Sequence, residues 1–355
     1  MIKILLFVLT AVGVPLLVLF FYAYARMGAL PGKAQVAEFE KLANFRDGRF
    51  ANDEPARLAA GPREMSKVVF RLFGRSANAP DAEIPQVKLG RGSFSDKPGG
   101  DSLIWLGHSM LIFELGGTRF ITDPVFGNAA PVPFAVMRYC ESPLARKDLP
   151  PLDFVLVSHD HYDHLEYETV RHFKDGGARF VVPLGVGARL TGWGIAPERV
   201  TELNWGDSAQ VGGVRITAAK ARHFSGRSPF DRDKTLWASY IIESGGKKVF
   251  FGADSGYGKH FKEIGDAHGP FDLVMLEADA WNERWPNNHM FPDEAVPALK
   301  DLRGRALMPI HWGVFDLAMH PWDESARLVR ENAERAGVPL FSPLMGERVP
   351  LFEGL

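Results

Sequence analysis

The sequence predicts a mixed α/β fold that follows a hydrophobic N-terminal helix. From residue 103 onward, short apolar runs separated by turn residues indicate β-strands, and in the second half of the chain these runs alternate with helical patterns. An uncharged apolar run near the N-terminus is long enough to cross a bilayer. The length of 355 residues fits two domains or one large α/β domain, so length alone does not decide the domain count.

The N-terminal apolar run predicts a membrane segment over residues 1–26. No charged residue occurs from Ile4 to Tyr22, and at a rise of ~1.5 Å per residue this run covers roughly 30 Å, the thickness of the hydrocarbon core. We expect an uncleaved single-pass anchor, which makes the protein membrane-associated. The alternative is a signal peptide cut after Ala25, with export of the mature chain. The basic residues before and after the run weakly favour a cytoplasmic location for the rest of the chain.

Residues 27–100 are expected to form a lead-in region and not a separate domain. Apolar side chains at a spacing of three from Val36 to Phe45 predict a short helix. Residues 63–75 predict a basic amphipathic helix, whose apolar face either docks on the main domain or lies on an anionic membrane surface. Frequent Pro, Gly, Ser and Asp from 77 to 100 predict a loop.

Residues 101–355 are expected to form one large domain. Two apolar runs flank Gly116-Gly117, which is typical of a hairpin, and the run at 153–157 predicts a buried strand that ends in polar residues. Further strands are predicted at 178–184, 214–221, 236–244, 247–255, 271–278 and 305–312, and helices at 167–174, 292–301 and 322–336.

Composition narrows the class of partner. Lys and Arg number 41 and Asp and Glu 43, so the chain lacks the positive field of a general nucleic-acid binder, and we expect no nucleic-acid partner. The single cysteine, Cys140, excludes an internal disulfide and a thiolate-rich metal cluster. Histidines and carboxylates must therefore hold any metal ion.

The strongest chemical signal is the motif His-Asp-His-Tyr-Asp-His at residues 159–164, directly after the strand at 153–157. Alternate residues of an extended segment project to the same side, so His159 and His161 can bind one ion together. A helical turn beyond them directs Asp163 and His164 toward a neighbouring ion. The competing interpretation, a polar loop with incidental histidines, is disfavoured by this spacing.

Two ions need ligands from elsewhere in the chain, and three candidates follow predicted strands: His223, Asp254 and His311. Each alone is compatible with an ordinary packed residue, but together with the motif they complete a dinuclear set. We expect two Zn²⁺ ions, other divalent metals remaining an alternative. The predicted ligands are His159, His161 and His223 for one ion, Asp163, His164 and His311 for the other, and Asp254 between them.

These motifs resemble the metallo-β-lactamase superfamily, and within it the N-acylphosphatidylethanolamine-hydrolysing phospholipases D. The likeness runs from about Leu106 to Arg348 and is carried by GHSMLIFELGGTRFITDPVF, LPPLDFVLVSHDHYDHLEYETV and MPIHWGVFDLA, among others. The resemblance implies a four-layer αββα sandwich with a dinuclear zinc site, and it carries every ligand role to the residues assigned above. It also implies that Asp123 accepts a hydrogen bond from a ligand imidazole, and that His289 lies near the substrate.

The resemblance implies a zinc-dependent hydrolase of lipid metabolism. The expected reaction is phospholipase D-type cleavage of N-acylphosphatidylethanolamine or related phospholipids by attack of a metal-bridging hydroxide. Asp163 and His289 are the catalytic candidates, His289 as an acid or hydrogen-bond donor and Asp163 in handling the proton of the nucleophile. The expected partners are a phospholipid substrate and the membrane, and a homodimer is left open.

Two alternatives remain at this stage. The first is a hydrolase of the same fold that acts on a lactone, an amide or a soluble phosphodiester, because the same metal motif serves all three. The second is a non-catalytic membrane-associated protein. One departure from the family concerns specificity: Glu277, Asp279 and Glu283 add negative charge that would repel an anionic substrate unless these side chains face away.

Overall fold

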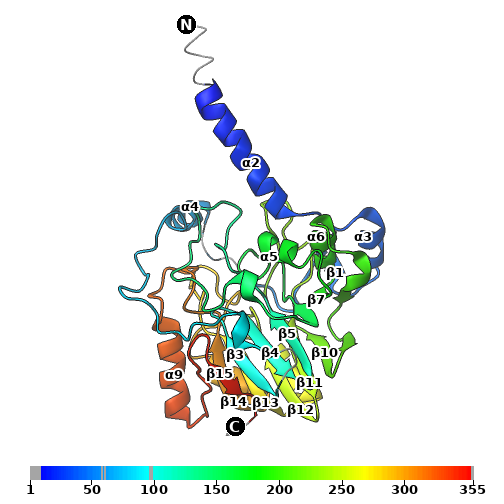
Figure 1. The fold of residues 1–355 in the computed structure, drawn as a ribbon, viewed down its shortest axis with the longest axis vertical. Helices are drawn as coiled ribbons and strands as arrows, with labels where there is room; N and C mark the ends of the chain where they lie inside the picture. The colour runs from blue at the N-terminus through cyan, green and yellow to red at the C-terminus, as the bar shows by residue number, and fades with distance from the viewer. Residues whose placement is uncertain (1–8, 57–58, 60, 96–98, 353–355) are drawn as a thin grey trace.

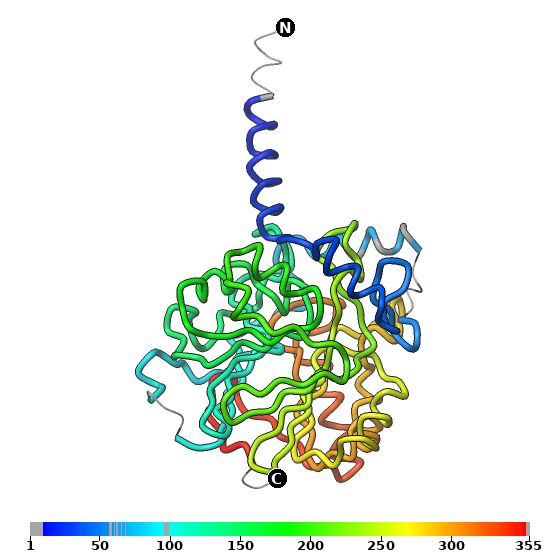
Figure 2. Tube along the Cα trace, turned by 90° about the vertical axis from the view of Figure 1, so that its right-hand side faces the viewer, coloured from blue at the N-terminus to red at the C-terminus, as the bar shows by residue number. Residues whose placement is uncertain are grey.

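The N-terminal hydrophobic segment is helical and projects from the domain (Figures 1 and 2). The computed structural model describes residues 9–56, 59, 61–95 and 99–352, so residues 1–8 of the predicted anchor lie outside the described residues. A π-helical turn, η1 (Leu9–Gly13), leads into α2 (Val14–Met27). The 18 residues from Thr10 to Met27 have a mean hydropathy of 1.5 and none is buried, which suits a membrane span or a signal sequence.

The lead-in contains a shorter helix than the spacing predicts. Helix α3 (Lys33–Phe39) ends at Phe39, and the chain then forms a small hairpin of β1 (Phe45–Arg46) and β2 (Arg49–Phe50). The prediction of a helix reaching Phe45 is therefore wrong. Phe39, Phe45 and Phe50 bury one another across the hairpin and pack on Trp237 of the main domain, a contact that a longer helix could not make.

The second lead-in helix, α4 (Pro62–Arg71), has exposed apolar side chains near its end. Val69 is 50% exposed and Phe70 is 79% exposed. Beyond the helix, Phe73 stacks on Phe134, and the amide of Gly74 donates to the Phe134 carbonyl. These contacts dock the end of the helix on the main domain. A loop with one 3₁₀ turn, η2 (Arg91–Ser93), leads on to the main domain.

Two packed sheets form the centre of the domain. The seven-stranded sheet has the order β15-β3-β4-β5-β6-β7-β8, and the six-stranded sheet has the order β14-β13-β12-β11-β10-β9. The strands of the first sheet are β3 (Ser102–Trp105), β4 (Leu111–Leu115), β5 (Thr118–Thr122), β6 (Phe154–Leu156), β7 (Arg179–Pro183), β8 (Val200–Leu203) and β15 (Arg348–Pro350). Those of the second are β9 (Ser208–Val211), β10 (Val214–Ala219), β11 (Ser239–Ser244), β12 (Lys247–Phe251), β13 (Phe271–Glu277) and β14 (Gly304–Ile310).

Alternation along the strands divides the core into three layers. In β4, Phe113 packs between the two sheets, whereas its neighbour Ile112 packs on the outer side of the first sheet. In β13, Met275 faces the other sheet and Val274 faces the helices that cover the second sheet. Both faces of each sheet are therefore covered, which explains why the central strands are apolar throughout.

Helices cover the outer faces and complete a four-layer αββα sandwich, as predicted (Figure 1). The first sheet is covered by α5 (Tyr167–His172) and α6 (Val186–Gly192), and the second by α7 (His260–His268), α8 (Ala295–Asp301) and α9 (Glu324–Ala336). Two 3₁₀ turns, η3 (Arg146–Asp148) and η4 (Pro197–Arg199), lie in connections.

Strand direction brings distant segments to one edge of the sandwich. Strands β5 and β6 are parallel, as are β12, β13 and β14, and two successive antiparallel pairings give β10 the direction of β12. The carboxyl ends of all these strands therefore meet at one edge. The polar residues that follow them form the candidate site.

Candidate metal centre

The loop after β6 supplies the first group of candidate ligands. His159 Nε2 lies 2.8 Å from His161 Nδ1, which lies 3.2 Å from Nε2 of His223 in the loop after β10. Oδ2 of Asp254, after β12, lies 3.8 Å from His159 Nε2 and 3.5 Å from His223 Nε2. The predicted first set is therefore brought together around one point.

The second group lies beside the first and shares Asp254 with it. Asp163 Oδ2 lies 3.3 Å from His164 Nε2 and 3.4 Å from His311 Nε2, and the two imidazole nitrogens are 3.2 Å apart. The other oxygen of Asp254, Oδ1, lies 3.2 Å from His164 Nε2 and 3.0 Å from His311 Nε2. Asp254 thus directs one oxygen to each group, as expected for a bridging carboxylate.

The spacing and protonation of these groups fit divalent cations. Donor atoms around a tetrahedral ion at about 2.0–2.1 Å lie roughly 3.3 Å apart, close to the separations observed. Burial lowers the pKa of His161 to about 4 and that of His223 well below its usual range, which favours the neutral, ligand form of the imidazole. Burial also lowers the pKa of His311, but the neighbouring carboxylates of Asp254 and Asp163 outweigh this effect and raise the pKa to about 10. These carboxylates therefore favour positive charge at the second group.

Asp123 lies where the resemblance placed it. The carboxylate is fully buried after β5, and its Oδ2 lies 2.7 Å from His164 Nδ1. The amide and hydroxyl of Ser158 both donate to Asp123 at 2.7 Å, so the carboxylate is held in position. This contact fixes the ring of His164 with Nε2 toward the second group.

His108 is a site residue that sequence reasoning missed. It lies in the turn between β3 and β4, and its Nε2 is 3.2 Å from Asp163 Oδ2. Its ring lies 3.9 Å from that of His311, and burial together with His311 lowers its pKa to about 3. The histidine of the GHSML segment was the only available signal. His108 extends the second group to four side chains that could hold a metal ion.

The backbone at the site is held in unusual conformations. Four non-glycine residues next to or within the two groups have positive φ: His108 (54°), Asp123 (38°), Ala253 (47°) and His311 (68°). This left-handed region is costly for residues with a Cβ atom and is found where the surrounding structure imposes it. The amide of His311 donates to the carbonyl of His108 at 3.0 Å, which ties together loops from both sheets.

His289 lies at the edge of the cluster and is held by Glu277. The Nδ1 of His289 is 2.5 Å from Glu277 Oε2, which leaves Nε2 without a hydrogen bond to the described residues. Burial lowers the pKa of His289, but the adjacent Glu277 reverses this effect and raises it. These two residues with Asp254 and His311 form a third group that could hold a cation.

The three acidic residues by which this chain departs from the family, Glu277, Asp279 and Glu283, do not place unpaired negative charge at the metal centre. Glu277 is paired with His289 and accepts from the amides of Ser255 and Met290. Asp279 is buried and accepts from the hydroxyl of Ser325. Glu283 is exposed and lines a different hollow of the surface. The expected repulsion is therefore not found at the metal centre.

Comparison with known proteins identifies the family. A family model described as a β-lactamase superfamily domain matches residues 118–312, more than half of the chain. The N-acyl-phosphatidylethanolamine-hydrolyzing phospholipase D 1 of Caenorhabditis elegans is 34% identical over 262 residues, which are 68% of this chain and 74% of that protein. The chain belongs to the β-lactamase superfamily. It is a metal-dependent hydrolase with the metallo-β-lactamase fold.

The chain is also similar to an uncharacterized relative and to a solved structure of a metallo hydrolase. An uncharacterized protein of Mycobacterium tuberculosis is 41% identical over 320 residues, covering 87% of this chain and 85% of that protein. The structure of a metallo hydrolase from the archaeon Ignicoccus hospitalis superposes with a TM-score of 0.55 at 22% identity, covering 70% of this chain and 97% of that one. At this identity the likeness concerns the fold alone.

A cavity of about 620 Å³ opens over the metal centre of this superfamily member. His161, Asp163, Asp254 and His289 lie in its wall. The rest of the lining is largely apolar, with one cation: Ala56, Phe224, Arg232, Ala280, Trp285, Asn288 and Leu317. The guanidinium of Arg232 lies 4.2 Å from the ring centre of Phe224. The cavity therefore combines candidate metal ligands, apolar walls and a positive charge.

A buried ion cluster supports the metal-binding loop from behind. Asp160 lies between His159 and His161 in sequence, but its carboxylate points away from the metal centre and accepts two bonds from Arg189 of α6, at 3.1 and 3.0 Å. Arg189 also donates to Asp231 at 2.6 Å and to the carbonyl of Met27 at the end of α2. No local pattern predicts that Arg189 pairs with Asp160, because the two residues are far apart along the chain.

Proposed function

We propose that this protein is a phospholipase D-type phosphodiesterase that binds two zinc ions and cleaves N-acylphosphatidylethanolamine or related phospholipids at a membrane. The observation that carries the proposal is the cavity over the metal centre, whose lining suits a molecule with both a phosphate and an acyl chain. The name of the Caenorhabditis elegans relative supports this substrate class.

The proposed ligands are the two groups joined by Asp254. His159, His161 and His223 would hold one ion, and Asp163, His164 and His311 the other, with His108 close to Asp163. Bound zinc ions would supply Lewis-acid chemistry, lowering the pKa of water and neutralising charge on the phosphate. Asp123 orients His164 in this scheme.

The chain's own side chains would position the substrate and move its protons. Phe224, Trp285 and Leu317 would pack against an acyl chain and exclude water, while Arg232 would bind a non-bridging phosphate oxygen. Hydrolysis forms a bond from water oxygen to phosphorus and breaks the bond from phosphorus to the headgroup alcohol. Nε2 of His289 would donate a proton to the departing alcohol oxygen, since Glu277 favours the protonated ring.

The proposal is tested with purified, zinc-loaded protein in detergent. We expect release of an N-acylethanolamine and phosphatidic acid from N-acylphosphatidylethanolamine, and a loss of at least about 100-fold in His161→Ala, because removal of a ligand costs more than removal of its outer partner. Arg232→Gln should lower kcat/KM about 10-fold or more through loss of a charge-assisted hydrogen bond. Arg305→Gln, an exposed arginine at the start of β14, is the matched control.

The same assay separates the competing substrate classes. A lactone, an amide and a soluble phosphodiester are offered in parallel to the same preparation. Turnover of one of these without phospholipid cleavage would replace the proposed substrate while leaving the hydrolase assignment in place. Localisation follows from the same proposal: α2 would hold the enzyme at the membrane that contains its substrate, which raises the local substrate concentration.

A further inference from the structure

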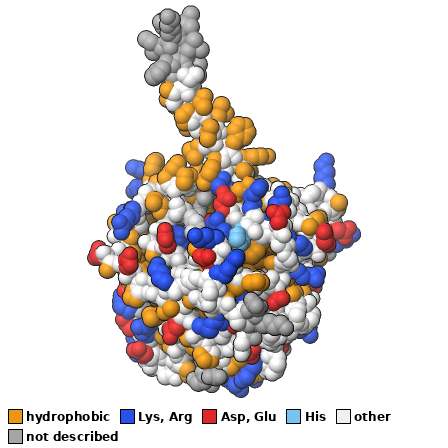
Figure 3. All heavy atoms as spheres, in the orientation of Figure 1, with side chains coloured by type: hydrophobic (Ala, Val, Ile, Leu, Met, Phe, Trp, Pro, Cys, Tyr) orange, Lys and Arg blue, Asp and Glu red, His pale blue; other side chains and the backbone are white. Residues whose placement is uncertain are grey.

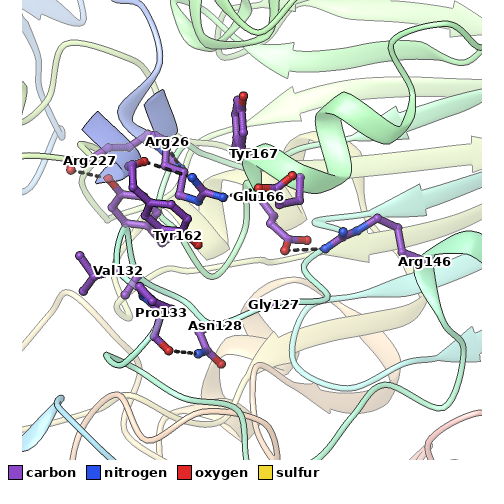
Figure 4. Close-up of a pocket in the computed structure, with 13 residues that line it drawn as sticks. Arg26, Gly127, Asn128, Val132, Pro133, Arg146, Tyr162, Glu166, Tyr167 and Arg227 are labelled. Carbon is purple, nitrogen blue, oxygen red and sulfur yellow. Dashed lines mark hydrogen bonds and ion pairs between the residues drawn. The ribbon is translucent and has the colours of Figure 1, made fainter. Parts of the chain in front are cut away.

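A second cavity lies where α2 meets the domain. It has a volume of about 270 Å³ and shares no lining residue with the cavity over the metal centre. Tyr22 and Arg26 of α2 form one wall, and the other walls come from the loop after β5, the start of α5 and the metal-binding loop (Figure 4). Tyr162 is the contribution of that last loop; its hydroxyl donates to the carbonyl of Arg227 at 2.9 Å.

Positive charge predominates in this cavity. Three arginines line it, Arg26, Arg146 and Arg227, against two carboxylates, Glu166 and Glu168. Arg146 pairs with Glu166 at 2.7 Å, and Arg26 pairs with Glu168. The guanidinium of the buried Arg227 donates only to carbonyl oxygens among the described residues, and the nearby carboxylates of Asp160 and Asp231 act against the effect of burial on its pKa. The lining itself has more arginines than carboxylates, which favours an anionic group here.

Donor groups remain for such an anion. Nη1 of Arg146 and Nε of Arg26 make no hydrogen bond to the described part of the chain, although the other nitrogens of both side chains do. Arginine presents paired N–H groups that match the oxygens of a phosphate. The arginines reach the cavity from separate segments, with Arg26 and Arg227 close together and Arg146 on the other side (Figure 4).

The cavity lies at the end of the apolar helix. The candidate span ends at Met27, and the guanidinium of Arg26 lies 3.4 Å from the ring centre of Tyr22. Tyrosine is enriched at the headgroup level of a membrane. Phe230, three residues beyond Arg227, is 87% exposed, and Phe134 beside the cavity loop is 46% exposed. Figure 3 shows hydrophobic side chains along the projecting helix and around its base.

We propose that this cavity binds the phosphodiester headgroup of a membrane glycerophospholipid, with Arg26 and Arg146 on the phosphate oxygens and the acyl chains alongside α2. The site is separate from the hydrolytic centre. It rests on α2 lying in a membrane and does not depend on which substrate is cleaved, so the two proposals can fail independently.

The test uses full-length protein in lipid nanodiscs of phosphatidylethanolamine and phosphatidylglycerol that contain a trace of phospholipid with a photoactivatable headgroup. We expect crosslinks in residues 22–26 and 127–133, mapped by mass spectrometry. Arg146→Gln should lower their yield about ten-fold, because one charge-assisted bond is lost, and Arg146→Lys should retain most of it. Arg330→Gln, an exposed position on α9 far along the chain from the cavity residues, is the matched control and should leave the yield unchanged.

Three outcomes would overturn the proposal. The first is an equal yield in wild type, Arg146→Gln and Val132→Trp, the last of which fills the cavity from its opposite wall. The second is crosslinking confined to the peptides of Phe224 and Trp285, which would place the lipid at the metal centre. The third is displacement of the crosslink by millimolar inorganic phosphate, which would assign the cavity to free phosphate. A protein inactive on phospholipids that still gives the expected crosslinks would refute the proposed function alone.

Discussion

Asp123 orients the candidate metal ligand His164 without itself facing the ion site. It accepts two hydrogen bonds from Ser158 and contacts only the far nitrogen of His164, so it determines ring orientation and leaves Nε2 facing the second group. Residues in such positions tune metal affinity without entering the coordination sphere. His108 also contacts a candidate ligand, Asp163, but it is itself one of the side chains that could hold the ion.

Replacing Asp123 by asparagine should weaken metal binding with little effect on the fold. Asp123→Asn keeps the size of the side chain but removes the negative charge that fixes the imidazole of His164, and we expect a loss of roughly 10- to 100-fold in metal affinity. Competition with a fluorescent chelator measures it. Asp175→Asn, at an exposed position, is the control. Unchanged affinity in Asp123→Asn would show that His164 does not need this partner.

The metal-binding loop depends on neighbouring elements as much as on its own sequence. Arg189 of α6 connects the loop, through Asp160, to Asp231 and to the end of α2. Arg227 donates to the carbonyl of Asp160, within the motif, and to that of Leu165, directly after it. Two buried arginines therefore hold the backbone that carries four of the candidate ligands.

Removing Arg189 should destabilise the whole domain. Arg189→Met leaves the buried carboxylates of Asp160 and Asp231 without their cation, and breaking a buried pair in this way costs about 3–5 kcal/mol. Urea denaturation followed by tryptophan fluorescence gives the free energy of unfolding. Arg171→Met, at an exposed site on α5, should change it little. Equal stability of the two variants would contradict a structural role for the ion cluster.

The end of α2 is part of the folded domain, although the rest of the helix projects from it (Figure 2). The carbonyl of Ala25 accepts from the indole of Trp193, that of Arg26 from Arg227, and those of Met27 and Gly28 from Arg189. These donors lie on the domain and the acceptors on the helix end. Several hydrogen bonds therefore join α2 to the domain at this point.

Two truncations should separate membrane attachment from stability. Deletion of residues 1–21 removes most of the apolar helix but keeps the carbonyl acceptors, so we expect a protein that leaves the membrane fraction and unfolds near the wild-type Tm in detergent. Deletion of residues 1–28 also removes the carbonyl acceptors of Arg189 and Arg227 and leaves their N–H groups without these partners. We expect the Tm of this variant to fall by about 5 °C or more. Membrane flotation and thermal unfolding measure the two effects. Equal Tm values would show that the helix end is only a tether.

The sequence by itself determined the parts of this protein that depend on neighbouring residues. Residues 159–164 place four candidate ligands on one loop, the apolar run before Arg26 has the length of a span, and continuous apolar runs reveal strands that are buried on both faces. Short or half-exposed strands such as β9 and β15 carry too few apolar residues to be distinguished from loops. Helix α3 ends early because its aromatic neighbours find better contacts across a hairpin.

Only the tertiary structure decided which distant residues share the site. The place of Asp254 between the two groups was expected from the sequence, but the pairing of His289 with Glu277 and of Asp160 with Arg189 was not, because these contacts join residues far apart along the chain. The same holds for the contact of His108 with Asp163 and for the cavity at the base of α2. Local sequence fixes the chemistry that a loop can offer, whereas the packing of two sheets and their helices fixes which loops meet.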